Sequence, residues 1–241
     1  MSAGIVLRSC LFAAILILIT PPYAVLSLLT FPFGPFTRYR IISSWTRIVL
    51  FALRHICRID FRVIGAENLP SRACVVLSKH QSAWETMAFQ LIFPPQVYVI
   101  KRELLWIPFF GWGLAMCSPI AINRSAGPRA ARQMLSQGKE RIATGFWVIV
   151  YPEGTRVAPG TRGKYQSSGS AIAIHAGAPV VPVAHNAGRC WRRNAFLKHP
   201  GTITVSIGPP IDSSGRKAEA LTREVETWIE TEMQRIDDGH A

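Results

Sequence analysis

Short apolar runs alternate with segments of helical periodicity along most of this chain. The apolar runs are rich in β-branched residues and lie at 73–78, 97–100, 119–122, 147–150, 179–184 and 202–208. The segments with helical character are residues 83–92, 128–145, 167–176 and 217–236. Buried strands that alternate with helices predict an α/β fold with a mixed, largely parallel sheet flanked by helices.

The amino-terminal region has a different pattern, because no charged residue occurs between Cys10 and Leu29. One helix of that length reaches across a hydrocarbon core, but Pro21 and Pro22 interrupt helical hydrogen bonding. We therefore expect either a kinked span or two short helices that dip into one leaflet. A cleaved signal peptide is the alternative, although no small-x-small cleavage site precedes the prolines. Residues 41–57 mix apolar and basic side chains at helical spacing and predict a helix on the membrane surface.

Composition and charge agree with a membrane protein. The chain is 49% hydrophobic, and its mean hydropathy is +0.21. Its formal charge of +13 lies mostly in residues 61–215. A basic region of this kind suits anionic partners such as lipid headgroups. Five arginines follow the apolar segment and only Arg8 precedes it, so we expect the remainder on the cytoplasmic side of a membrane, the bacterial inner membrane. The expected domains are a membrane-anchoring helical segment over 1–60 and a larger domain over 61–241. The five cysteines are widely separated and lack ligand spacing, so no metal site is expected.

Polar residues follow each of the first five predicted strands. They are Lys79 and His80, then Lys101 and Arg102, then Asn123 and Arg124, then Glu153 to Arg156, and last His185 and Asn186. If most of these strands are parallel, their carboxyl ends share one edge of the sheet, where open α/β sheets bind ligands.

His80 and Glu85 form the first candidate pair for chemistry. Five residues apart, they cannot share one face of a helix, so they meet only if His80 precedes the helix and Glu85 lies in its first turn. Glu85 would then hold one ring nitrogen while the other accepts a proton from an alcohol. The spacing of Ser82 and Glu85 also fits a capping box, which would give Glu85 a structural role only.

The segment from Tyr151 to Arg156 carries a stronger signal. An acid, a glycine and an arginine come directly after an apolar strand. Glycine permits close backbone approach to a ligand, and arginine supplies the forked donors that suit phosphate. A plain turn with a solvated Arg156 is the alternative.

Four blocks in order over residues 79–184 resemble the PlsC-like lysophosphatidate acyltransferases of the glycerolipid acyltransferase superfamily. The blocks are His80 to Glu85, Ile122-Asn123-Arg124, Pro152-Glu153-Gly154-Thr155-Arg156, and Val180-Val181-Pro182-Val183-Ala184. The segment Lys101-Arg102-Glu103-Leu104, with Ile107-Pro108 and Gly111, is also similar to this family. One departure is that Glu85 stands where the family usually has Asp.

The resemblance implies the glycerolipid acyltransferase fold over 61–241 and acyl transfer from coenzyme A or acyl carrier protein to the sn-2 hydroxyl of lysophosphatidate. It implies His80 as the base, Glu85 as its partner, and Lys101, Arg124 and Arg156 around the substrate phosphate, with Glu153, Gly154 and Thr155 shaping the acceptor site. It implies no cofactor beyond the acyl thioester co-substrate. We expect membrane lipids, lysophosphatidate and the acyl donor as partners, and no nucleic acid.

Other functions remain open at this point. The acceptor could be glycerol 3-phosphate, another lysophospholipid or a lyso-ornithine lipid. A thioesterase would use His80 to activate water. A membrane-tethered protein that only binds anionic lipid or nucleic acid would also fit the charge, but such a protein does not need ordered motifs at strand ends.

Overall fold

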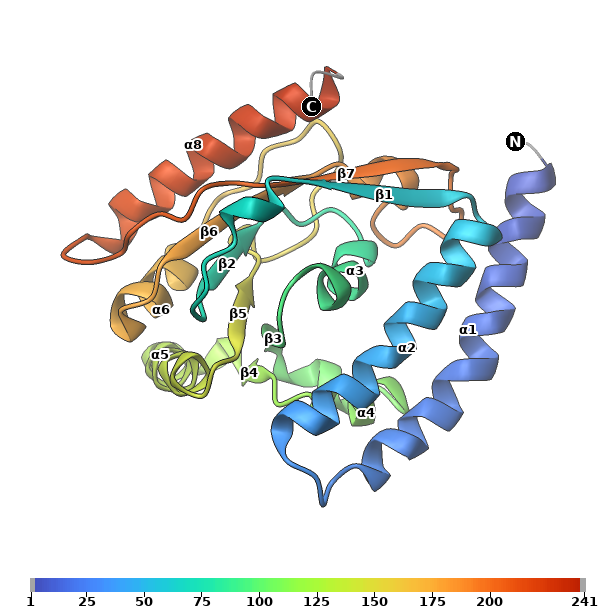
Figure 1. The fold of residues 1–241 in the computed structure, drawn as a ribbon, viewed down its shortest axis with the longest axis horizontal. Helices are drawn as coiled ribbons and strands as arrows, with labels where there is room; N and C mark the ends of the chain where they lie inside the picture. The colour runs from blue at the N-terminus through green and yellow to red at the C-terminus, as the bar shows by residue number, and fades with distance from the viewer. Residues whose placement is uncertain (1–2, 239–241) are drawn as a thin grey trace.

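Two long helices form an antiparallel pair at the amino terminus of the computed structural model, which describes residues 3–238. They are α1 (Ala3–Leu29) and α2 (Pro35–His55), and Figure 1 shows them side by side at one flank of the molecule. α1 continues through Pro21 and Pro22 as one helix, so the alternative of two short helices is wrong. Among the described residues α1 is the one helix long and apolar enough to cross a membrane.

Seven strands form one sheet in the order β1-β7-β6-β2-β5-β3-β4. Their bounds are β1 (Ile59–Ile64), β2 (Val75–Ser78), β3 (Gln96–Lys101), β4 (Ile120–Ile122), β5 (Trp147–Val150), β6 (Val180–His185) and β7 (Gly201–Ile207). The strands from β2 to β6 are mutually parallel, whereas β7 is antiparallel to β6 and parallel to β1. The predicted mixed, largely parallel sheet is confirmed, and all six predicted strands are present.

Helices cover both faces of this sheet (Figure 1). Their bounds are α3 (Trp84–Ile92), α4 (Phe110–Met116), α5 (Pro128–Ala143), α6 (Ser168–Ala176), α7 (Ala187–Cys190) and α8 (Ala218–Asp237), with short 3₁₀ turns η1 (Ala66–Asn68), η2 (Arg102–Trp106) and η3 (Arg124–Ala126). One face packs against α1, α2 and α3 through side chains such as Phe12, Leu53 and Phe89. The other face packs against α5, α6 and α8, where Leu221, Val225, Ile229 and Met233 point into the core.

The register places the carboxyl ends of the parallel strands at one edge. Ser78 at the end of β2 pairs with Val183 of β6, and Leu77 pairs with Val150 at the end of β5. The polar residues that follow these strands therefore gather at this edge, as predicted. Because Phe12 and Leu53 of the amino-terminal helices share a core with the sheet, that pair of helices is packed onto the site-bearing body; a domain boundary at residue 60 stays a prediction.

Candidate active site

His80 and Glu85 form a close pair at the carboxyl end of β2. The chain leaves β2 at Ser78 and begins α3 at Trp84, so His80 lies in the connecting loop and Glu85 in the first turn of the helix. His80 Nδ1 lies 2.8 Å from Glu85 Oε1. The Nδ1–H that donates to this carboxylate leaves the lone pair on Nε2, which is the tautomer that a general base needs.

Glu85 also caps its own helix. The backbone N–H groups of Gln81 and Ser82 donate to the same Oε1 atom, at 2.9 and 2.8 Å. The sequence leaves two alternative roles for Glu85, a helix cap and a partner of His80. In the structure one carboxylate has both roles. Burial alone would raise the pKa of Glu85, but His185, His80 and the Ser82 N–H lower that pKa below its ordinary value. The carboxylate is thus ionised at neutral pH, although its side chain is fully buried.

Tyr151 forms one wall of the histidine site. Its ring stacks on the His80 imidazole with centroids 3.9 Å apart and planes 13° apart. Tyr98 lies behind it, 6.2 Å from the Tyr151 centroid. Burial raises the pKa of both tyrosines well above the ordinary value. The neutral Tyr151 ring thus restricts the imidazole plane, while 14% of the His80 side chain stays exposed.

A second buried group of charges lies directly beside the pair. Lys79 Nζ lies 2.8 Å from Glu153 Oε1 and 2.8 Å from Glu230 Oε1 of α8. The hydroxyl of Tyr165 donates to Glu230 Oε1 at 2.8 Å. Lys79 and Glu153 are buried, with 1% and 0% of their side chains exposed. We call Lys79, Glu153, Glu230 and Tyr165 the Lys79 cluster.

The Lys79 cluster reaches the backbone of His80. In the peptide group between Lys79 and His80, the His80 N–H donates to Glu153 Oε2 at 3.1 Å. The carbonyl oxygen of the same peptide group accepts from His185 Nε2 at 2.8 Å. Burial lowers the pKa of His185, which keeps this imidazole neutral with its proton on Nε2. Side chains from β6 and from the 151–156 segment therefore fix the plane of the peptide that carries the candidate base.

The remaining predicted residues lie at the same edge but differ in exposure. Gly154 adopts a φ of 67°, which favours glycine in this turn, and Thr155 is exposed. Arg156 is partly buried, and among the described residues its Nε has no hydrogen-bond partner. Lys101 is exposed at the end of β3. Arg124 begins η3, and its side chain is outside the described part of the structure.

Sequence reasoning missed the supporting residues. Tyr151 was noted only as the start of a motif, and Lys79 and His185 only as polar residues at strand ends. Nothing in their spacing connects Lys79 with Glu230, which is 151 positions away. A lysine directly after one apolar strand and a histidine at the end of another are a signal, because a charged or polar side chain that becomes buried there needs a partner. That is the signal that could have identified them.

The fold and the site define an acyltransferase, and the comparisons with known proteins agree. Residues 60–186 match the family model described as Acyltransferase. The chain is 42% identical over 98% of its length to the 1-acyl-sn-glycerol-3-phosphate acyltransferase of Pseudomonas aeruginosa, and it covers 94% of that protein. This chain therefore belongs to the Acyltransferase family.

More distant relatives match most of this chain. The chain is 28% identical over 93% of its length to the chloroplastic 1-acyl-sn-glycerol-3-phosphate acyltransferase LPAT1 of Arabidopsis thaliana, of which it spans 61%. The crystal structure of the 1-acyl-sn-glycerophosphate acyltransferase PlsC from Thermotoga maritima superposes with a TM-score of 0.81, at 22% identity and over 97% of this chain and 96% of the other. This likeness confirms the predicted fold, including the long amino-terminal apolar helix.

Proposed function

We propose that this chain transfers a fatty acyl group from an acyl thioester to the sn-2 hydroxyl of 1-acyl-sn-glycerol 3-phosphate and so forms phosphatidic acid. The observation that carries the proposal is the 2.8 Å contact between His80 and Glu85, which presents Nε2 of His80 as a base at the sheet edge. The 42% identity to the Pseudomonas aeruginosa relative supports the choice of acceptor. The donor is acyl-coenzyme A or acyl carrier protein.

The reaction needs one positioned base. His80 Nε2 accepts the proton of the sn-2 hydroxyl as the oxygen attacks the thioester carbonyl carbon. The tetrahedral intermediate then expels the thiolate, and His80 returns the proton to the sulfur. Glu85 stabilises the imidazolium that exists between these steps, and such a base contributes about 10²–10⁴-fold to the rate. The acyl group passes directly from sulfur to oxygen, with no acyl-enzyme intermediate.

The substrate phosphate is assigned to basic residues at the same edge. Arg156 is the best-supported of them, because its Nε is buried without a hydrogen-bond partner among the described residues, and a phosphate oxygen would satisfy it. Lys101 and Arg124 are assigned with it from the family pattern. Gly154 and Thr155 border this position, whereas the Glu153 carboxylate is already engaged by Lys79 and the His80 N–H.

The protein is associated with a membrane through its amino-terminal apolar helix. We place the α/β body on the cytoplasmic side of the bacterial inner membrane, because five arginines follow the uncharged segment of α1 and only Arg8 precedes that segment. An acceptor with one acyl chain in that membrane and its headgroup at the surface suits this arrangement.

The test is an assay of the purified, membrane-reconstituted chain with lysophosphatidate, glycerol 3-phosphate, another lysophospholipid and a lyso-ornithine lipid as acceptors. Each acceptor is offered with acyl-coenzyme A and with acyl carrier protein. We expect phosphatidic acid as the main product and a loss of about 10²–10⁴-fold in kcat for His80→Ala. The proposal fails if another acceptor is preferred, if free fatty acid is the main product, or if His80→Ala keeps its activity.

A further inference from the structure

An exposed aromatic segment follows β3 at the same edge as His80. It comprises Trp106, Ile107, Phe109, Phe110 and Trp112, which we call the 106–112 patch, and the exposed fraction of these residues ranges from 40% to 66%. No charged residue occurs between Glu103 and Arg124. Soluble surfaces rarely gather so many large apolar side chains in so short a segment, and such a patch marks an interaction site.

The chain is folded to present these side chains rather than to bury them. Phe109 has φ 63° and ψ −58°, a conformation that is costly for a bulky residue. The N–H of Gly111 donates to the carbonyl of Ile107 at 2.8 Å, and a Cβ at Gly111 would lie 2.3 Å from the Leu105 carbonyl oxygen. The aromatic side chains therefore project from a compact turn with little freedom to collapse.

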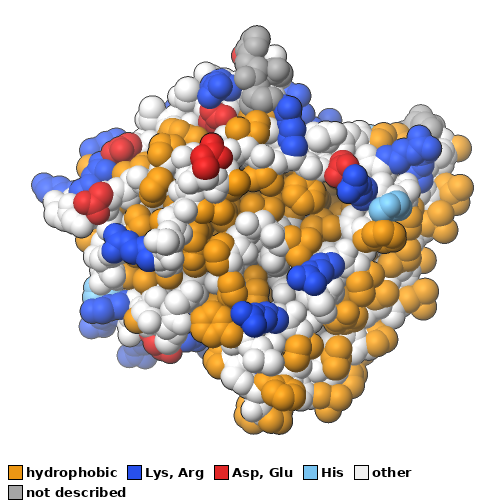
Figure 2. Space-filling view, in the orientation of Figure 1, with side chains coloured by type: hydrophobic (Ala, Val, Ile, Leu, Met, Phe, Trp, Pro, Cys, Tyr) orange, Lys and Arg blue, Asp and Glu red, His pale blue; other side chains and the backbone are white. Residues whose placement is uncertain are grey.

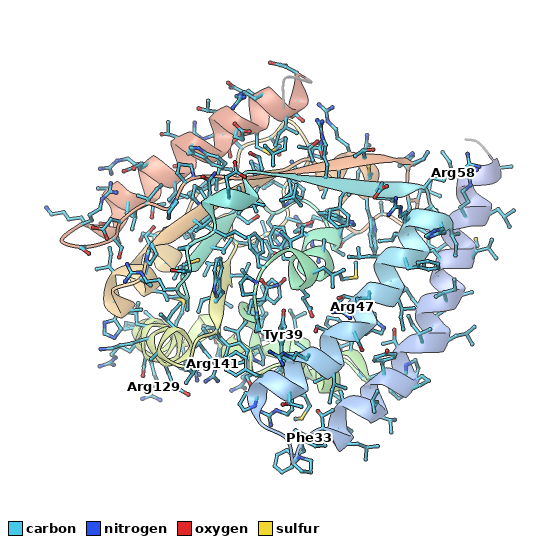
Figure 3. All side chains as sticks on the ribbon, viewed as in Figure 1. Phe33, Tyr39, Arg47, Arg58, Arg129 and Arg141 are labelled. Carbon is cyan, nitrogen blue, oxygen red and sulfur yellow. The ribbon has the colours of Figure 1, made fainter. Side chains whose placement is uncertain are left out.

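The patch is continuous with the membrane helix. α4, which carries Phe110 and Trp112, packs against α1. At this contact a Cβ placed on Gly113 would lie 3.7 Å from Oγ of Ser27 in α1. Around this contact α1 and the following turn expose Leu29, Phe31 and Phe33. Figure 2 shows hydrophobic side chains gathered over the flank formed by α1, whereas charged side chains lie over α8, and Figure 3 shows Phe33 at the turn between α1 and α2.

We propose that the 106–112 patch inserts into the lipid bilayer beside α1 and holds the His80 edge of the sheet against the membrane surface. Because α4 is packed on α1, a bilayer that surrounds the exposed side of α1 also meets α4. The rim of the patch has the chemistry of a headgroup layer: Lys101 and Arg102 are exposed, and the Arg102 guanidinium lies 5.6 Å from the centre of the Trp106 ring. Tryptophan and arginine are enriched where acyl chains meet phosphates.

Two other occupants fit the patch less well. An acidic carrier protein binds best to a basic surface. The segment from 104 to 123 is uncharged, so it does not offer one. A second copy of this chain would cover the patch in solution but would have to exclude the lipid that α1 requires. The experiment below distinguishes a second copy of this chain from lipid through the covalent dimer that it would form.

The experiment uses a photoreactive benzoylphenylalanine placed at Trp106 or at Phe110, one position at a time, in the full chain reconstituted in phosphatidylglycerol–phosphatidylethanolamine vesicles. The matched control is the same group at Ile64, which is also an exposed apolar residue (37%) but lies on β1, at the other end of the strand order from β3 and β4. After illumination, mass spectrometry counts protein–lipid adducts.

We expect several-fold more lipid adduct at Trp106 and Phe110 than at Ile64. Equal adduct at all three positions, or a covalent dimer as the main product at Trp106 and Phe110, overturns the proposal. Crosslinking needs no turnover, so this result is independent of whether the chain acylates lysophosphatidate.

Discussion

Two buried glutamates lie on either side of His80 and are used in different ways. Glu85 directs one oxygen to the imidazole and to two backbone N–H groups, and its Oε2 has no hydrogen-bond partner among the described residues. Glu153 directs one oxygen to Lys79 and to the N–H of Gly163, and the other to the N–H of His80. Glu85 therefore orients the ring of the base, whereas Glu153 holds its backbone.

The comparison separates two kinds of buried carboxylate. A carboxylate whose two oxygens are both engaged by protein donors offers little to a ligand without breaking those bonds, and breaking them is costly in a buried site. This favours a positioning role for Glu153 over direct contact with the acceptor. The ion pairing differs too, because Glu153 shares the Lys79 ammonium with Glu230, while Glu85 has an imidazole and backbone N–H groups as its hydrogen-bond partners.

The largest effect is expected for Lys79→Met, which removes the ammonium group of the Lys79 cluster. Glu153 would be left buried without a counterion, and breaking a buried ion pair in this way costs about 3–5 kcal/mol. The free energy of unfolding, measured by denaturant titration of the protein in detergent, should fall by that amount. The matched control is Arg162→Met, which breaks the pair between Arg162 and Glu226 of α8. In this pair 63% of the arginine side chain is exposed. A surface pair contributes about 0–1 kcal/mol, so equal losses in the two variants would contradict a sealed cluster.

A smaller effect is expected for Glu85→Ala, which leaves His80 Nδ1 without its acceptor. The imidazole loses its fixed tautomer and the charge that stabilises its protonated form, and we expect kcat to fall by about 10²-fold. Steady-state kinetics with lysophosphatidate measures this change. Unchanged activity would leave Glu85 only its cap on α3.

Glu85→Asp sharpens the same point, because Asp is the usual residue of the family. The shorter side chain must reach Nδ1 from the same turn of α3, so we expect activity between that of wild type and of Glu85→Ala. Full activity would mean that the 79–86 segment shifts to accommodate either acid.

Glu153→Gln is expected to have a moderate effect, and the affected parameter distinguishes the two roles. If Glu153 holds the backbone of His80, kcat falls by about tenfold, or about 1.4 kcal/mol, while KM for lysophosphatidate is nearly unchanged. A raised KM with unchanged kcat would instead assign Glu153 to the acceptor site, as the sequence predicts. Glu226→Gln on α8 is the control, since Glu226 pairs with Arg162 at the surface, and it should leave both parameters at wild-type values.

Much of the fold could be predicted because its core strands are short and uniformly apolar. Val75 to Leu77 and Val148 to Val150 are buried on both faces of a parallel sheet, which produces the continuous apolar runs seen in the sequence. β1 was missed because Asp60 and Arg62 interrupt its apolar pattern, as is common in a strand at the border of a sheet. Pro21 and Pro22 do not divide α1, since the helix continues through them.

The candidate site was predictable only in part, and the reason lies in distance along the chain. His80 and Glu85 are close in sequence, so their geometry follows from the start of one helix. Tyr151 meets His80 because β5 lies beside β2, and Glu230 meets Lys79 because α8 crosses the opposite face. Such contacts depend on strand order and helix docking, which no local pattern encodes.

The smallest effect is expected in the pH dependence of stability and concerns His185. Burial lowers the pKa of this imidazole below its ordinary value of 6.5, with Glu85, His80 and Lys79 as its charged neighbours. Above 6.5 the folded and unfolded states both keep His185 neutral. As the pH falls below 6.5, the unfolded chain binds a proton that the folded site resists, so stability is lost until the folded pKa is reached.

Glu85 contributes below its ordinary pKa of 4.5, because its folded pKa is lowered from that value. In His185→Gln the amide can still donate to the Lys79 carbonyl but cannot titrate. The melting temperature of this variant should therefore fall less steeply than that of wild type just below pH 6.5, and the two curves should run parallel only once the pH lies below the folded pKa of His185. Parallel curves throughout would mean that His185 takes up its proton equally readily in the folded and unfolded states, which would contradict the lowered pKa of the folded imidazole.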